Sequence, residues 1–490
     1  MRRYDEEGRV QRARLIKLAS AAVAALAVAP IVAACGSGYT PGTINIYSMP
    51  DGAPYVEKAA DACNAASNGE YTIKVSSLPK SADDQRLQLA RRLTGNDHSV
   101  DLMTTDVVWT AEFADAGWIE PLPQQYADEV RAATLPGPLD TATWKKKGTD
   151  AEQLFAFPAW TNTQLLWYRP DVLKKYTGSA QPPQTWDELL ADNAKITTAG
   201  GPSWIATMGA RYEGLMVWFN SVLLSAGGSV VDPSDPTRQT VDDTPEHRAA
   251  TVRALEVLKQ VATAPGHDPS ISNNMEGQAA QAMLDGHATF EMNWPFVFAG
   301  MRTNAAAGSV PFLPQFAKQF PEFADEKATV PDATIVKANT ALKPYFTWAR
   351  YPGFAGPSGS VTSLSTIGGN NIAVASTSRQ KDLAFKAAAC LTNQASQRIY
   401  GVDGGTPPVR ADLYRDKSFQ LAYPMYQTIL DQLQTVDGVA AVRPKTPVYQ
   451  AMSTLIVQKL SPVGNFDPQK LVGTLADQVN KAITGKGLIP

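Results

Sequence analysis

Cysteine and histidine are scarce in this chain of 490 residues, which contains three cysteines and four histidines. The histidines, at positions 98, 247, 267 and 287, are not spaced as metal ligands. The sequence also has neither a glycine-rich phosphate loop nor the G-x-S-x-G turn of an α/β-hydrolase. We therefore expect no metal, no cofactor and no catalytic residue, although an acid pair of the glycosidase kind remains open because carboxylates are numerous.

An excess of positive charge is also lacking. The 44 Lys and Arg residues nearly balance the 47 Asp and Glu residues, for a net charge of −3, which becomes −6 when residues 1–34 are left out. The basic run at residues 145–147 is too short to alter this balance and is typical of a solvated loop. Because nucleic-acid-binding domains need a positive surface, we expect no nucleic-acid partner.

Long apolar runs are missing beyond the N-terminus, so no later segment is expected to span a bilayer. Residues 1–34 begin with basic side chains and continue into an uncharged, alanine-rich run. This pattern predicts a signal peptide, and the following Cys35 completes a sequence that resembles a bacterial lipobox. We expect Cys35 to be lipidated, residues 35–42 to form a tether, and the protein to lie on the outer face of the cell membrane. An ordinary signal peptide with an incidental cysteine is the alternative.

The two remaining cysteines, Cys63 and Cys390, favour a disulfide, because an even number of cysteines outside the cytosol is usually paired. Two separately buried thiols are the alternative. A bridge would place the predicted helix around residue 60 beside the helix around residue 390.

Strand and helix patterns alternate after the tether. We predict strands at 43–48, 71–75 and 100–103, with helices at 54–64 and 83–93 between them. Such alternation favours an α/β fold with a mostly parallel sheet. The roughly 456 residues after the signal exceed what one hydrophobic core usually serves, so two lobes are expected.

Further helices are predicted from apolar periodicity, capping residues and terminal glycines or prolines. They cover residues 213–225, 244–264, 276–284, 380–394, 413–433, 446–460 and 467–483. Residues 310–360 are rich in proline, phenylalanine and glycine, and element boundaries there are not predicted.

Residues 155–170 are dense in aromatic side chains but contain four consecutive uncharged polar residues, from Thr161 to Gln164. A plain buried strand would not carry such a run. We interpret this segment as crossing between the two lobes and lining the cleft between them.

Several motifs, taken in order, resemble one family. They are Trp160 to Asp171, TWDEL at 185–189, the turn at 283–288 leading to Asn-Trp-Pro at 293–295, the Gly-Gly-Asn strand at 368–370, and residues 384–397 running on to TPPVR at 406–410. This set is similar to the extracellular solute-binding proteins of ABC sugar importers, the maltose-binding-like class, and covers nearly the whole chain. Within the class the chain most resembles the trehalose-binding lipoproteins of mycobacterial importers.

The resemblance implies a periplasmic-binding-protein fold, with two α/β lobes that are each discontinuous in sequence and a ligand cleft between them. Lobe one would comprise residues 43–160 and 370–430, and lobe two residues 161–369 and 431–490. It also implies a monomer that captures a disaccharide, trehalose being favoured, and delivers it to an ABC permease with its ATPase subunits. A receptor for another oligosaccharide, or a secreted carbohydrate-active enzyme, is the alternative.

The resemblance also implies a set of sugar-binding residues, each with a simpler alternative. Asp106 follows a strand end and could instead cap a helix; Asn162 could be a loop amide. Trp294 could pack in a core rather than stack on a sugar, Arg443 could be a surface residue, and Glu276 could serve only the helix dipole.

Four weaker candidates complete the predicted site. Gly368 and Gly369 would let the backbone approach the ligand closely, unless they form a simple bulge. Gln85 and Asp51 supply further hydrogen-bonding groups of the kind that bind sugar hydroxyls.

Overall fold

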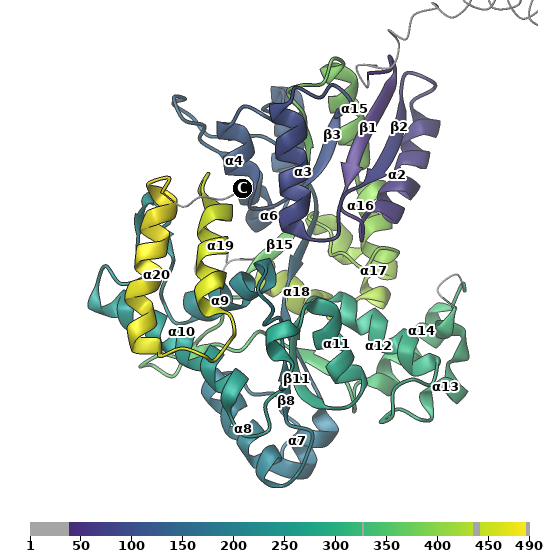
Figure 1. Ribbon diagram of the computed structural model, residues 1–490. Coiled ribbons are helices and arrows are strands. Elements are labelled where there is room, and N and C mark those ends of the chain that lie inside the picture. Colours follow the sequence, from purple (N-terminus) through teal and green to yellow (C-terminus); the bar gives the residue numbers. More distant parts are fainter. Residues whose placement is uncertain (1–38, 326–327, 435–441, 487–490) are drawn as a thin grey trace, which may run out of the picture.

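The computed structural model describes residues 39–325, 328–434 and 442–486. The chain folds into two α/β lobes, one above the other in Figure 1, which confirms the expected two-lobed architecture. The predicted signal peptide, Cys35 and the first residues of the tether lie outside the described residues. None of the helices in the described part of the chain is long and apolar enough to cross a membrane.

The first lobe is built on a five-stranded sheet of order β2-β1-β3-β15-β6. β1 pairs in parallel with β2 and with β3, whereas β15 runs antiparallel to β3 and β6. The strands are β1 (Thr43–Ser48), β2 (Thr72–Ser77), β3 (Leu102–Asp106), β6 (Phe157–Thr163) and β15 (Ile367–Val374). The helices around this sheet are α2 (Ala53–Ala66), α3 (Ala82–Thr94), α4 (Thr110–Asp115), α5 (Gln124–Ala133), α6 (Pro136–Thr141), α15 (Lys381–Leu391) and α16 (Gln394–Val402).

Local sequence signals account for these elements. In β1 the residues Ile44 and Ile46 are fully buried while their neighbours are partly exposed, which is the alternation expected of a strand. The helix α3 begins after Ser81, whose side chain accepts a hydrogen bond from the backbone N–H of Asp84, and it ends at Gly95. β3 lies at the centre of the sheet. Its carboxyl end points toward the second lobe (Figure 1).

The second lobe has a four-stranded sheet of order β12-β7-β11-β8. β11 pairs in parallel with β8, and β7 runs antiparallel to both β11 and β12, so three of the four strands share one direction, as expected of a mostly parallel sheet. β7 is reversed because it enters directly from the first lobe rather than through a helical crossover. The strands are β7 (Leu165–Tyr168), β8 (Trp204–Ala206), β11 (Ala288–Asn293) and β12 (Thr347–Ala349). The helices of this lobe are α7 (Pro170–Thr177), α8 (Trp186–Thr198), α9 (Glu213–Ser225), α10 (Pro245–Thr263), α11 (Glu276–Leu284), α12 (Phe296–Ala306), α13 (Phe316–Gln319) and α14 (Asp332–Leu342).

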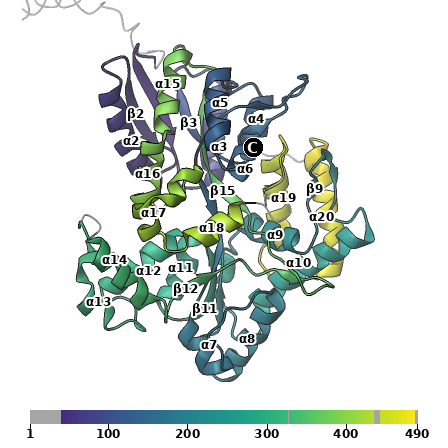
Figure 2. The ribbon, with the colours of Figure 1, turned by 180° about the vertical axis from the view of Figure 1, so that it is seen from behind.

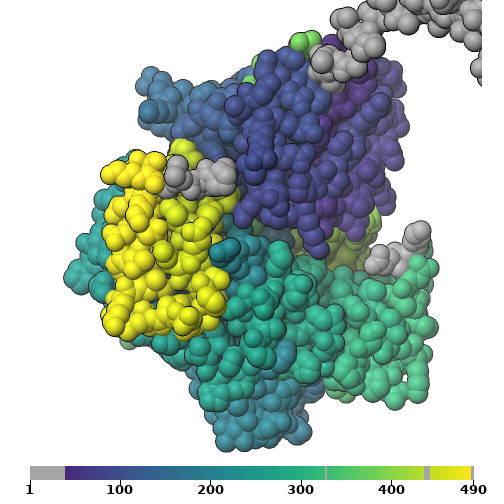
Figure 3. Space-filling view, viewed as in Figure 1, coloured from purple at the N-terminus to yellow at the C-terminus, as the bar shows by residue number. Residues whose placement is uncertain are grey.

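The C-terminal part of the chain returns to both lobes. The predicted helix at 413–433 is wrong as a single element: it is divided into η3 (Ala411–Arg415), α17 (Lys417–Ala422) and α18 (Tyr426–Leu433). Pro424 explains the last break, because proline cannot continue a helix. The final helices α19 (Tyr449–Leu460) and α20 (Pro468–Ile483) pack against α9 and α10 of the second lobe, and they form the yellow surface in Figure 3.

Cys63 in α2 and Cys390 in α15 form a disulfide across 327 sequence positions. Both helices flank the first sheet (Figure 1), so the bridge lies within one lobe. A bridge in this place ties distant parts of the chain together without joining the two lobes.

The aromatic and polar stretch becomes the first crossing between the lobes. β6 ends at Thr163, β7 begins at Leu165, and only the buried Gln164 separates them. The helix α18 lies between the two lobes (Figure 2) and contacts β6. The side chain of Gln432 in α18 donates hydrogen bonds to Thr163 Oγ1 at 2.8 Å and to the Gln164 carbonyl at 2.9 Å.

We expect Gln432→Leu to lower the free energy of unfolding by about 1–3 kcal/mol, because it leaves buried polar groups of the crossing without a partner. The same side chain also accepts from the backbone N–H of Tyr351. Urea unfolding measures the change. Gln427→Leu is the matched control, because Gln427 is an exposed residue of the same helix whose side chain bonds Asp431 alone among the described residues, and its loss should cost less than about 0.5 kcal/mol. Equal effects would show that the hydrogen bonds of Gln432 to the crossing add no stability.

Candidate functional site

Asp106 is the last residue of β3, at the end of the first sheet that faces the second lobe. It lies opposite Asn370 of β15, and its Oδ1 accepts a hydrogen bond from the backbone N–H of Val108 at 3.2 Å. The next helix begins at Thr110 with Trp109 at its N-cap, so the alternative that Asp106 caps this helix is wrong. Its carboxylate is about one-fifth exposed and free to face the neighbouring lobe.

Arg443 reaches this carboxylate from the other side. Its guanidinium donates from Nη2 to Asp106 Oδ1 at 2.6 Å and from Nη1 to Glu213 Oε1 at 2.7 Å. The side chain is only 3% exposed, so the alternative of a surface arginine is wrong. Because Glu213 opens α9 of the second lobe, Arg443 links the two lobes through a pair of carboxylates.

Glu213 was not among the residues predicted from the sequence. Its carboxylate accepts hydrogen bonds from Ser453 Oγ at 2.6 Å and from the hydroxyl of Tyr449, in addition to the guanidinium of Arg443. The available signal was a single acid at the start of the otherwise apolar α9. Ser453 and Tyr449, both in α19, hold the Glu213 carboxylate in place. Glu213 therefore anchors Arg443 to the second lobe, independently of what the other guanidinium nitrogens of Arg443 contact.

The charges in this group affect one another. Burial opposes the charge of Arg443, but the carboxylates of Asp106 and Glu213 outweigh it and hold the arginine pKa above its ordinary value. Burial raises the pKa of Glu213 in spite of the positive charge of Arg443 beside it. The Nε of Arg443 is buried and has no partner among the described residues, so one donor of the group remains unused.

Asn162, Gly368 and Trp294 meet at the boundary between the lobes. Asn162 in β6 pairs with Gly368 in β15, and a Cβ atom at position 368 would lie 2.9 Å from Cη2 of Trp294 and 3.5 Å from the Asn162 Cβ. Trp294 directly follows β11 of the second lobe and is only partly buried, so it is not a core residue of that lobe. The structure thus brings together an amide, a close-approach glycine and an indole from two lobes.

Gly369 has a different role from Gly368. Its φ of +125° is unfavourable for a side chain, and a Cβ atom there would lie 2.4 Å from the Trp160 carbonyl oxygen. A register shift also occurs in β15 between Asn370 and Asn371, so the bulge alternative applies to this strand just beyond the glycines. Gly368 leaves room for the indole, whereas Gly369 is needed for the backbone path.

The other predicted residues are placed less centrally. Glu276 is the first residue of α11. The pKa of Tyr212 is raised first by burial of its hydroxyl and second by the negative charge of Glu276. Asp51 lies in an exposed turn after β1. Gln85 is buried in α3 and donates to the Lys80 carbonyl at 3.3 Å. Among the described residues, neither Asp51 nor Gln85 makes a hydrogen bond to another predicted site residue.

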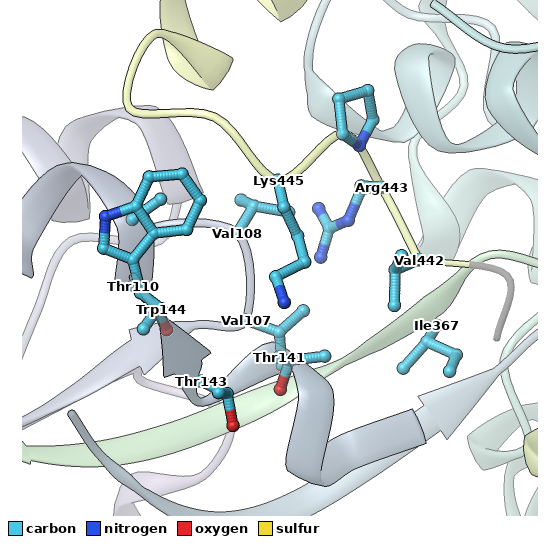
Figure 4. A pocket seen from close by; sticks show the side chains of 12 residues that line it. Val107, Val108, Thr110, Thr141, Thr143, Trp144, Ile367, Val442, Arg443 and Lys445 are labelled. Atoms are coloured by element: carbon cyan, nitrogen blue, oxygen red, sulfur yellow. The ribbon is translucent and has the colours of Figure 1, made fainter. Parts of the chain in front are cut away.

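Further polar contacts cross between the lobes beside Arg443. Gln450 in α19 donates to Asp83 in α3 at 2.6 Å, and Lys445 pairs with Asp140 in α6 at 2.7 Å. Beneath Arg443 and Lys445 is a cavity of about 20 Å³, also lined by Val107 and by Trp144 (Figure 4). This cavity has room for about one water molecule and is too small for a sugar.

The described residues include no cluster of histidine, cysteine and acidic side chains that could hold a metal ion. The carboxylates of Asp106 and Glu213 are both bonded to the same guanidinium.

Comparison with known proteins places the chain among binding proteins. Residues 48–398 match the family model described as bacterial extracellular solute-binding protein. A probable ABC transporter-binding protein of Deinococcus radiodurans is 28% identical over 410 residues, covering 81% of this chain and 82% of the relative. A putative binding protein of Brucella abortus is 27% identical over 187 residues, which is 37% of this chain and 41% of that protein.

Solved structures share the fold. A maltose-bound MalE3 protein of T. maritima superposes with a TM-score of 0.68 at 23% identity, covering 89% of this chain and 98% of the other. The GacH receptor of Streptomyces glaucescens, solved unliganded and with acarbose, has a TM-score of 0.66 at 20% identity, covering 91% of this chain and 99% of the receptor. At these identities the likeness shows the fold alone, and the two lobes are those of a periplasmic-binding-protein fold.

Proposed function

The chain belongs to the bacterial extracellular solute-binding protein family, and from this premise we propose that it captures a disaccharide between its lobes for an ABC importer. Members of this family are carriers rather than enzymes, so the alternative of a carbohydrate-active enzyme is excluded. Trehalose is the favoured sugar, because the chain resembles trehalose-binding lipoproteins. The related binding protein of Deinococcus radiodurans supports the link to an ABC transporter.

The observation that carries the proposal is the meeting of sugar-binding groups from both lobes. A disaccharide presents many hydroxyls and patches of C–H surface, which call for charged or amide hydrogen-bonding groups beside an aromatic face. Asp106 and Asn162 on the first lobe, and Arg443 and Trp294 reaching from the second, supply those groups. Three or four charge-assisted hydrogen bonds of about 1.5–3 kcal/mol each reach the roughly −8 kcal/mol of a micromolar binder.

The proposed motion is a hinge between the two lobes. The bounds expected from the sequence, 160/161 and 369/370, move by a few residues, because β6 ends at Thr163 and β15 begins at Ile367 within the first sheet. The crossing at Gln164 is one hinge segment. The second hinge segment includes Thr366, just before β15. The buried side chains of Asn220 and Ser221 in α9 hold it by donating hydrogen bonds to Thr366 Oγ1 at 3.0 and 2.8 Å. Ligand drives closure only through contacts that it gains in the closed state. Arg443 can exchange Asp106 for sugar hydroxyls while Glu213 keeps it in place.

We propose that Cys35 carries the lipid anchor and that the monomeric, liganded form docks on a permease with its ATPase subunits. One acyl chain anchors a protein only marginally, so stable attachment requires several chains on this cysteine. Mass spectrometry of the protein released from membranes by detergent tests the anchor. An unmodified Cys35 in the mature protein would refute it.

A thermal-shift panel of di- and oligosaccharides on residues 43–490 tests the proposed function. A sugar that binds only the folded state raises its melting temperature, and we expect the largest shift with trehalose. Maltose and sucrose serve as comparisons of equal size. A larger shift with another oligosaccharide would replace trehalose as the ligand, and no shift with any sugar would refute a sugar receptor.

We expect Asp106→Ala and Asn162→Ala each to weaken trehalose binding by about 1.5–3 kcal/mol, because each removes a hydrogen-bonding group from the cleft. Isothermal titration calorimetry measures the affinity, and circular dichroism checks that the fold is kept. Asp128→Ala is the control, since Asp128 is an exposed carboxylate of α5. If the affinity of either site variant equals that of the control, that residue does not contact the sugar.

A further inference from the structure

Asn293 is a fully buried amide at the end of β11, and every hydrogen-bonding group of its side chain is used. Its Oδ1 accepts from the backbone N–H of Trp294 at 2.9 Å. Its Nδ2 donates to the backbone carbonyl of Glu276 at 3.0 Å and to Glu291 Oε1 at 2.7 Å. One amide therefore joins two candidate sugar-binding residues, Trp294 and Glu276, to a third residue that faces no sugar.

That third residue, Glu291, lies in the middle of the second sheet. It sits opposite Trp167 of β7 and Ala206 of β8 and is 1% exposed. A carboxyl group in such a place needs hydrogen bonds, and the bond with the Asn293 amide is the one that the structure provides among the described residues.

We propose that Asn293 and Glu291 are positioning residues of the binding cleft, which hold Trp294 and the start of α11 in the geometry that receives the sugar. This inference rests on the proposed sugar-binding function. The indole of Trp294 lies against Gly368 of the other lobe, so a small change in its backbone moves an aromatic face at the lobe boundary. Glu291 keeps the Asn293 amide oriented with its oxygen toward Trp294 and its nitrogen toward Glu276.

The protonation of Glu291 adds a measurable property to this network. Burial raises its pKa to about 8, and the Asn293 hydrogen bond only partly opposes that effect. The acid is therefore neutral at pH 6 and ionised at pH 9. An ionised carboxylate accepts a stronger hydrogen bond from the Asn293 amide, since this bond lowers the pKa of Glu291, and it needs further donors as well. We therefore expect ionisation above pH 8 to draw the amide toward Glu291 and away from the Glu276 carbonyl, which changes the support of Trp294.

The surroundings of Glu291 contain few competing charges. Among the described residues, the titratable groups on the elements packed against β11 are Tyr168 on β7 and Glu276 on α11, and β8 has none. Arg302 lies on α12, which follows β11 and packs against α11. None of these groups shifts the pKa of Glu291. The shift comes from burial, which raises the pKa, and from the hydrogen bond of Asn293, which lowers it. A transition near pH 8 at Trp294 therefore reports on Glu291.

The first test measures trehalose affinity by calorimetry at pH 6 and pH 9. We expect the wild-type dissociation constant to rise several-fold at pH 9, and Asn293→Ala to raise it at least tenfold at pH 6. In Glu291→Gln, which keeps an acceptor for the Asn293 amide but cannot ionise, the ratio between the two pH values should fall to about one. Asp101→Asn is the matched control, because Asp101 is a buried acid with a raised pKa in the first lobe, and its variant should keep the wild-type ratio. Equal pH ratios in wild type and Glu291→Gln would overturn the inference.

The second test needs no sugar. In ¹⁵N spectra the indole N–H signal of Trp294, assigned by its absence in Trp294→Phe, should shift with a midpoint near pH 8 in the wild type and stay constant in Glu291→Gln. A signal that shifts equally in both proteins, or in neither, would overturn the inference even if trehalose binds. If the wild type binds no trehalose but this signal titrates as expected, the proposed ligand is wrong and the positioning network stands.

Discussion

Arg443→Met is expected to lower the free energy of unfolding by about 3–5 kcal/mol, the cost of removing one partner from a buried charge group. The arginine is 3% exposed and bonds Asp106 and Glu213 from opposite lobes. Methionine fills the space of the aliphatic stem but leaves the Glu213 carboxylate with only the hydroxyls of Ser453 and Tyr449. Urea unfolding monitored by circular dichroism measures the loss.

The matched control is Arg238→Met. Arg238 also pairs with two carboxylates, Asp232 and Asp243, but its side chain is 52% exposed, so its loss should cost less than about 1 kcal/mol. The deficit of Arg443→Met should also depend on pH. Without the guanidinium the folded-state pKa of Glu213 rises further above its ordinary value of 4.5, so stability is lost as pH rises above that value. We therefore expect a larger deficit at pH 8 than at pH 5, and equal losses in the two variants would contradict the buried charge group.

Replacing both Cys63 and Cys390 with serine is expected to lower the free energy of unfolding by about 5–6 kcal/mol. The bridge closes a loop of 327 positions, and the chain-entropy model gives a loop of this length a stabilisation of that size. The denaturation midpoint in urea should fall for the double variant and for the wild type in reductant, and reductant should not change the double variant further. Because both cysteines lie in the first lobe, sugar affinity should be retained.

Intact-mass analysis of the exported protein after alkylation, with and without reductant, decides whether the bridge forms. Two thiols that are alkylated without reductant would contradict the disulfide. If the bridge forms but its removal does not lower the free energy of unfolding, the result would instead contradict the entropic estimate.

Local patterns alone determined much of the fold. The helices at 213–225 and 276–284 have the predicted bounds, because apolar periodicity, an acidic first turn and terminal glycines are encoded within each segment. The alternation after the tether likewise predicted the first sheet, with residue 106 at a strand end. The break within 413–433 had a readable signal in Pro424, which the apolar periodicity obscured.

Tertiary structure alone decided which side chains meet. Arg443 lies 337 positions from Asp106 and 230 from Glu213, and no local preference specifies that the three side chains share one buried site. The hydrogen bonds from Asn293 to Glu291 and Trp294 could not be predicted either, because the sequence of a strand does not specify the hydrogen-bond partner of a buried acid. In the stretch from Thr161 to Gln164 the composition indicated a lobe crossing. Only the docking of α18 and β15 showed that Thr163 is held by Gln432 while Asn162 pairs with Gly368 at the lobe boundary, since these contacts join segments far apart in the sequence.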